Sequence, residues 1–106
     1  MKLRVEPEAN GEVAEALAWQ VRRFRYDVAS RLWQLWNAGL AAIEARPWTY
    51  PMVEDWPTDE PSIRNYLLPR YGYRIVYRIK DDNILVVAFA RGRRNSGHWH
   101  DRITDS

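Results

Sequence analysis

Alternating and helical hydrophobic patterns predict a strand followed by two helices. Lys2 to Val5 alternates polar and apolar residues ahead of Pro7, which predicts a short edge strand. From Glu8 the apolar residues recur at helical spacing. This first stripe consists of Val13, Leu17, Val21 and Phe24. A second stripe lies between Tyr26 and Arg46, and Pro47 marks its end. We predict two helices that fold back on each other as a hairpin.

The second half of the chain predicts a loop and three strands. Residues 47–61 contain four prolines, which exclude a regular helix or a central strand there. Strands are predicted at residues 62–68, 73–80 and 84–90, and the last is apolar on both faces, as in a strand covered on both sides. Asp81-Asp82-Asn83 predicts a tight hairpin turn, because Asp and Asn tolerate left-handed backbone. The predicted order is β-α-α-β-β-β.

Length and composition restrict the class of protein. A chain of 106 residues is long enough for one stable core, so we predict a single domain over residues 1–106. No apolar run approaches the ~18–20 residues that cross a bilayer. The chain has no cysteine, which excludes disulfides and thiolate metal sites and is compatible with a reducing compartment. We expect a cytoplasmic protein without a membrane segment.

Charge is distributed unevenly along the chain. Residues 1–61 carry 7 Lys/Arg and 10 Asp/Glu, whereas residues 62–106 carry 9 and 4. The net charges of the two parts are therefore −3 and +5, which predicts a basic working face on the second half. The basic residues gather after the last predicted strand, around Trp99. This cluster comprises Arg91, Arg93, Arg94, Arg102, His98 and His100.

Cofactor and metal chemistry find no support in the sequence. The HWH segment lacks a third ligand at a defined spacing, and the neighbouring arginines oppose a divalent cation. Gly92 and Gly97 do not open a strand-to-helix turn, so a phosphate-binding loop is not expected. We expect neither a cofactor nor a metal site.

Four segments resemble the RelE/ParE family of bacterial type II toxins. DVASRLWQLWNAGLAAIEARP is similar to the family's long helix, and IRNYLLPR is similar to its strand with an arginine ahead of a leucine pair. YRIVYRIKDDNI resembles the family's strand and acidic turn, and RGRRNSGHWHDR resembles its arginine-rich terminal segment. The resemblance covers nearly the whole chain. It implies an α+β fold in which a helical hairpin packs on a curved antiparallel sheet.

The resemblance also implies partners and an activity. Such a protein is the toxin of a toxin–antitoxin module and inhibits growth until a cognate antitoxin binds it. A homodimer and a toxin–antitoxin hetero-oligomer are both compatible with it. ParE-like members poison DNA gyrase, whereas RelE-like members cut mRNA on the ribosome. The ending HWHDR looks closer to the ParE-like branch, so gyrase or a similar protein target is the preferred interpretation.

Ribosome-dependent mRNA cleavage is the alternative interpretation, and it would make the protein an enzyme. Cutting RNA needs a base, an acid and cations that stabilise the extra phosphate charge. By resemblance, arginines would stabilise the phosphate and a histidine would carry the proton. These candidate catalytic residues are Arg74, Arg94, His98 and His100. RNA-cutting members carry a lysine pair where this chain has Asn65 and Leu67, so the catalytic set is incomplete.

A second group of residues is predicted to bind the target or the antitoxin. It comprises Arg64, Arg91, Arg93, Trp99, Arg102 and Trp33. Structural roles compete with this prediction. Arg93 would pair with Asp101, Arg64 would bridge to the acidic loop, and Trp99 would pack as a core or lid aromatic. Trp33 lies off the main stripe of its helix, which favours exposure, whereas Arg78 and Lys80 are interpreted as solvated charges.

Overall fold

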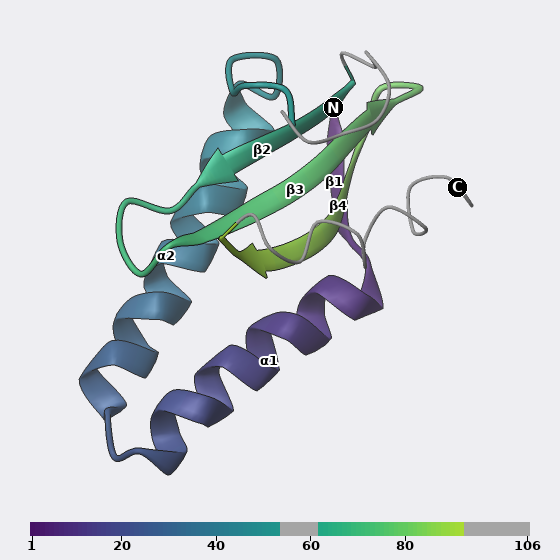
Figure 1. Ribbon diagram of the computed structural model, residues 1–106. Coiled ribbons are helices and arrows are strands. Elements are labelled where there is room, and N and C mark those ends of the chain that lie inside the picture. The colour runs from purple at the N-terminus through teal and green to yellow at the C-terminus, as the bar shows by residue number, and fades with distance from the viewer. Residues whose placement is uncertain (54–61, 93–106) are drawn as a thin grey trace.

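The element order of the protein is the predicted one. A computed structural model describes residues 1–53 and 62–92. The elements along the chain are β1 (Lys2–Val5), α1 (Pro7–Arg22), α2 (Tyr26–Ala45), β2 (Ile63–Leu67), β3 (Tyr73–Lys80) and β4 (Asn83–Arg91). Both helices lie on one side of the sheet (Figure 1). The α+β class and the helical hairpin are therefore confirmed.

The sheet is mixed, whereas an antiparallel sheet was expected. Its strand order is β1-β4-β3-β2, and β1 pairs with β4 in parallel, while the other pairs are antiparallel. Tight connections reverse the chain between β2, β3 and β4, so these strands alternate in direction. Along the chain, β1 is separated from β4 by the two helices and by β2 and β3. It lies at the outer edge of β4 and runs in the same direction. The apolar β4 is a central strand, as its sequence predicted.

The first helix ends before its apolar stripe does. Pro7 occupies its first turn, where the missing N–H costs nothing, and the helix ends at Arg22. Phe24 then adopts a left-handed conformation with φ of 58°. The Arg25 N–H donates to the Gln20 carbonyl at 3.0 Å, which closes the helix end in the manner usually seen with glycine. Phe24 consequently lies outside the core, with 80% of its surface exposed.

The main core lies between the helices and the sheet. It combines Ala9, Val13, Ala16, Leu32, Trp36, Ile43, Leu68, Ile75, Tyr77, Ile79, Ile84, Val86 and Phe89. Trp36 of α2 meets Phe89 of β4 edge-on, with 5.2 Å between the ring centroids. Gly39 allows α2 to approach the sheet closely, because a Cβ there would lie 2.7 Å from Cδ1 of Ile75. We call this side of the sheet the helix face.

The opposite side of the sheet, which we call the outer face, carries a second buried cluster. Its members are Val53, Ile63, Val76, Val87, Ala88 and Ala90. The pairing shifts by one residue, so that Val76 pairs with Ala88 but Tyr77 pairs with Val86. Val87 is therefore a bulge residue, and the bulge changes the alternation of β4 between the two faces. β4 is apolar throughout because both of its faces are buried.

Candidate functional site

The described strands carry several basic side chains on the outer face of the sheet. Cross-strand partners point to the same side of a sheet, so the pairing register decides which residues share a face. Leu3 and Val5 pair with Ile84 and Val86 of the main core, which leaves the other residues of β1 on the outer face. The cations of this face are Lys2 and Arg4 from β1 and Arg74, Arg78 and Lys80 from β3.

Four of these cations form two rows across three strands. Lys2 pairs with Asn83, which pairs with Lys80. Arg4 pairs with Leu85, which pairs with Arg78. The rows are two residues apart, about 6.6 Å, and their ends are two strand spacings apart, about 10 Å. The cations thus stand at the corners of a rectangle, with a neutral residue of β4 in the middle of each row.

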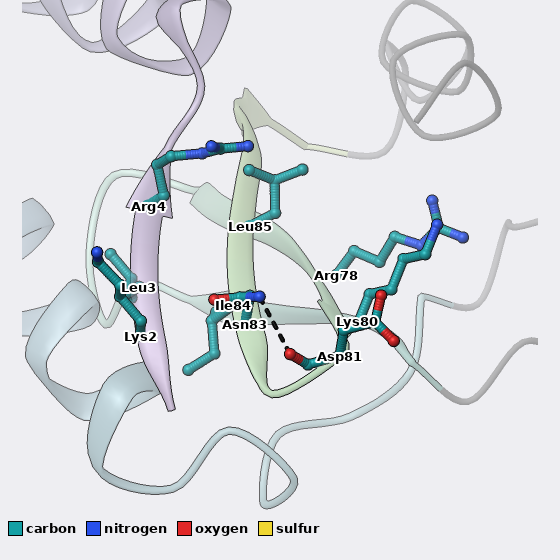
Figure 2. A pocket seen from close by; sticks show the side chains of 9 residues that line it. All are labelled: Lys2, Leu3, Arg4, Arg78, Lys80, Asp81, Asn83, Ile84 and Leu85. Carbon is teal, nitrogen blue, oxygen red and sulfur yellow. Dashed lines mark hydrogen bonds between the residues drawn. The ribbon is translucent and has the colours of Figure 1, made fainter.

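The rectangle surrounds a hollow of about 480 Å³ (Figure 2). Arg78 and Lys80 extend side by side from β3, whereas Lys2 and Arg4 lie beyond β4 on β1. Asp81 also lines the hollow, and its carbonyl accepts a hydrogen bond from Nδ2 of Asn83 at 3.0 Å. We call the site formed by Lys2, Arg4, Arg78, Lys80, Asn83 and Leu85 the basic hollow. Its size is typical of sites that hold small ligands or segments of larger ones.

Arg74 lies on the outer face but away from the basic hollow. It pairs with Leu67 of β2 on one side and Ala90 of β4 on the other, and only 7% of it is exposed. Leu67 itself is 67% exposed at the sheet edge. The cross-strand partners of Arg74 are thus both apolar, and neither can take up a proton.

Arg64 has a structural role on the helix face. It pairs with Tyr77, and its Nη1 donates to the carbonyls of Trp48 at 3.0 Å and Tyr50 at 2.7 Å. Its guanidinium also lies 5.1 Å from the ring centroid of Trp48. These contacts hold the segment after α2 against β2. The predicted role of Arg64 in binding a target or an antitoxin stays a prediction.

Arg91 lies at the end of β4, near α1. Its guanidinium carbon is 5.8 Å from the ring centroid of Tyr73, which stacks on Phe89 with 4.5 Å between centroids. A hollow of about 320 Å³ opens here between α1 and β4. Its lining includes Glu12, Glu15 and Trp19 as well as Arg91. This site combines an aromatic pair with charges of both signs.

The predicted residues that the structure describes do not form one site. Arg74 lies on the outer face, Arg64 and Arg91 lie toward the helix face, and Trp33 lies on α2, half exposed. The exposure of Trp33 agrees with its position off the main apolar stripe. The remaining predicted residues, Arg93, Arg94, His98, Trp99, His100 and Arg102, lie outside the described residues.

Burial affects the ionisation of Tyr77. Its hydroxyl donates to the Pro47 carbonyl at 2.6 Å, linking the end of α2 to the middle of β3. Burial raises the pKa of Tyr77 far above its usual range, and the nearby Arg64 charge opposes this only in part. The phenol therefore stays neutral and acts as a hydrogen-bond donor, not as a proton carrier.

The sequence alone gives no sign of the basic hollow, and it favours interpreting Arg78 and Lys80 as solvated charges. The alternation of β3 places them on one face, but their relation to Lys2 and Arg4 depends on the parallel pairing of β1 with β4.

Residues 1–53 and 62–92 contain no group of three His, Cys, Asp or Glu side chains placed to hold a metal ion. In the same residues, no helix has the length and apolarity to span a membrane.

Comparison with known proteins shows a likeness at the level of the fold. No family model matches the sequence, and no curated protein matches it. Among solved structures, the chain is similar to a chain from the chromosomal ParDE TA system of P. aeruginosa, with a TM-score of 0.71 and 16% sequence identity. The match covers 88% of this chain and 97% of that chain. The protein therefore has the fold of a chain from a ParDE system.

Proposed function

We propose that this protein is the toxin of a type II toxin–antitoxin module. In this proposal it inhibits growth by binding DNA gyrase or a similar protein target, and a cognate antitoxin neutralises it. The supporting observation is the fold shared with a chain of a ParDE system over nearly the full length of both chains. A shared fold does not by itself fix an activity, so the target must be argued from individual residues.

Among the residues that the structure describes, the cross-strand neighbours of Arg74 favour a binding surface over a ribonuclease centre. Cleavage of RNA through its 2′-hydroxyl needs a proton acceptor and a donor close to the phosphate-binding cations. On the outer face, Arg74 is flanked by Leu67 and Ala90. Asn65 faces Val76, and its amide nitrogen lies 3.2 Å from the Pro51 carbonyl. The β2 positions where RNA-cutting relatives are expected to carry lysines thus hold an amide and an apolar side chain.

A supercoiling assay tests the proposed target. The purified full-length protein is added to DNA gyrase and relaxed plasmid, with and without the protein encoded beside it as the candidate antitoxin. We expect loss of supercoiling that the antitoxin candidate restores. Unchanged supercoiling, together with cleavage of mRNA on translating ribosomes, would contradict the gyrase target and support the ribonuclease alternative.

A further inference from the structure

We propose that a groove between α1 and the end of β4 binds a nucleoside monophosphate. This proposal goes beyond the toxin function and does not rest on it. The groove has two parts, namely the hollow of about 320 Å³ beside Glu12 and Glu15 and a smaller hollow of about 180 Å³. The two parts adjoin, because Trp19, Tyr73 and Arg91 line both of them. We call the larger part the glutamate hollow and the smaller part the arginine hollow.

The arginine hollow suits a phosphate group. Besides the three shared residues, its lining consists of Gln20, Arg25, Val28 and Tyr71. Within residues 1–53 and 62–92, the guanidinium groups of Arg25 and Arg91 make no ion pair. Arg25 also directly precedes the first turn of α2, where the helix dipole favours a negative charge. Asp27 in that turn is exposed and does not line the hollow. Two guanidinium groups at a helix N-terminus are a favourable setting for phosphate.

A buried amide in the arginine hollow lacks a hydrogen-bond partner. Gln20 is only 9% exposed, and in the described part of the chain its Oε1 accepts no hydrogen bond. An unsatisfied buried acceptor is unfavourable. The terminal torsion of glutamine is soft, so the amide can turn toward a donor that enters the hollow. A sugar hydroxyl near the phosphate is such a donor, which makes a sugar phosphate a better ligand than a bare anion.

The glutamate hollow suits an aromatic base that carries an amino group. The rings of Trp19 and Tyr73 supply aromatic surface, and Trp19 is 37% exposed. Glu12 already accepts the Phe89 N–H, whereas Glu15 makes no ion pair within the described residues. The Glu15 carboxylate can therefore accept from an exocyclic amino group. Both carboxylates repel phosphate, so the base lies in the glutamate hollow and the phosphate lies in the arginine hollow.

Isothermal titration calorimetry of the full chain with adenosine monophosphate tests this proposal. The first test variant, Arg25→Gln/Arg91→Gln, removes both cations of the arginine hollow. Its matched control is Arg22→Gln/Arg31→Gln, which removes the same charge from exposed positions on α1 and α2. The second test variant, Gln20→Leu, replaces the unsatisfied amide by an apolar side chain of similar size. Thermal melting monitors the folding of each variant.

We expect Arg25→Gln/Arg91→Gln to weaken binding at least about tenfold, because each lost contact is a hydrogen bond to a charged group. The control variant should bind within about twofold of the wild type. Gln20→Leu should bind about fivefold more weakly, while its melting temperature equals or exceeds that of the wild type. This combination separates a binding role from a structural one and holds even if the arginine variant fails to fold. Equal weakening in the control variant, or no binding of millimolar nucleotide to the wild type, would overturn the proposal.

Comparison of ligands tests which chemical groups the groove recognises. Uridine monophosphate lacks the exocyclic amino group and should bind about fivefold more weakly than adenosine monophosphate. Adenosine that binds as tightly as its monophosphate would overturn the assignment of the phosphate. Inorganic phosphate that competes as well as the nucleotide would overturn the assignment of the base. Displacement of the nucleotide by a dipeptide of lysine and glutamate at equal concentration would overturn the proposal and assign the groove to a peptide with charges of both signs.

Discussion

Oε1 of Glu12 in α1 accepts a hydrogen bond from the backbone N–H of Phe89 in β4, at 3.1 Å. The pairing of β1 with β4 ends at Val5 and Val86, and within residues 1–53 and 62–92 no further strand pairs with the edge of β4 beyond that point. A partly buried N–H on such an edge needs an acceptor. Glu12 supplies it, and α1 is thereby positioned by a polar contact as well as by apolar packing.

Glu12→Ala should destabilise the protein by about 2 kcal/mol, because it leaves the Phe89 N–H without its charged acceptor. The matched control is Glu15→Ala, an exposed position on the same helix, which should change stability by no more than about 0.5 kcal/mol. Urea unfolding followed by circular dichroism measures both. Equal stability of the two variants would show that the contact contributes nothing.

Phe24→Gly should stabilise the protein by about 1 kcal/mol. Phe24 has φ of 58° at the end of α1, a conformation that costs a residue with a Cβ about 1–2 kcal/mol and glycine almost nothing. Its exposed ring contributes little packing to offset this cost. Phe24→Ala keeps the Cβ and should leave stability nearly unchanged, which separates the backbone effect from the ring. A lower melting temperature for Phe24→Gly than for Phe24→Ala would contradict this explanation.

Tyr77→Phe should cost about 1–2 kcal/mol near neutral pH, because the Pro47 carbonyl loses its donor. Burial raises the pKa of Tyr77 in the folded state, whereas an unfolded tyrosine ionises near pH 10. The raised pKa therefore contributes stability that is present below about pH 10 and is lost as the pH rises above it. The advantage of the wild type over Tyr77→Phe should shrink between about pH 9 and 11. A constant difference in urea unfolding across this range would contradict the assignment.

His98→Ala/His100→Ala should retain toxicity if the protein acts by binding a protein target, because such binding needs no proton transfer. Histidine is the side chain whose ordinary pKa lies near neutral, and the sequence contains two of them and no cysteine. Growth after induced expression is the readout, and circular dichroism of the purified variant checks its folding. Loss of toxicity in the folded double variant would favour ribonuclease chemistry over gyrase inhibition.

Local patterns predicted the elements more accurately than their pairing. The β3 range, Tyr73–Lys80, and the β1 range, Lys2–Val5, agree with the structure, because alternation over a few residues determines them. The left-handed turn at Asp81 and Asp82 was likewise visible in the residue types. The end of α1 at Arg22 could not be predicted in this way, because helical periodicity alone favours a helix that continues to Phe24.

The candidate site was harder to predict because it depends on contacts between distant parts of the chain. The alternation along β3 places Arg74 on the opposite face of the sheet from Tyr73 and Tyr77. That Arg64 and Arg91 both lie on the helix face follows only from the register of β2 and β4 with β3. The basic hollow joins residues near both ends of the described chain through the parallel pairing of β1 with β4. Charge counts predicted a basic second half, whereas two of the four cations of this hollow come from β1.

Pulse-labelling with thymidine and methionine in the minutes after induced expression, without antitoxin, tests the central claim most directly. The account predicts that thymidine incorporation falls first, because a poisoned gyrase stops replication before it affects protein synthesis. An early fall in methionine incorporation would contradict the gyrase target and identify translation as the process inhibited. Unchanged growth and incorporation, with soluble protein present, would contradict the toxin function itself.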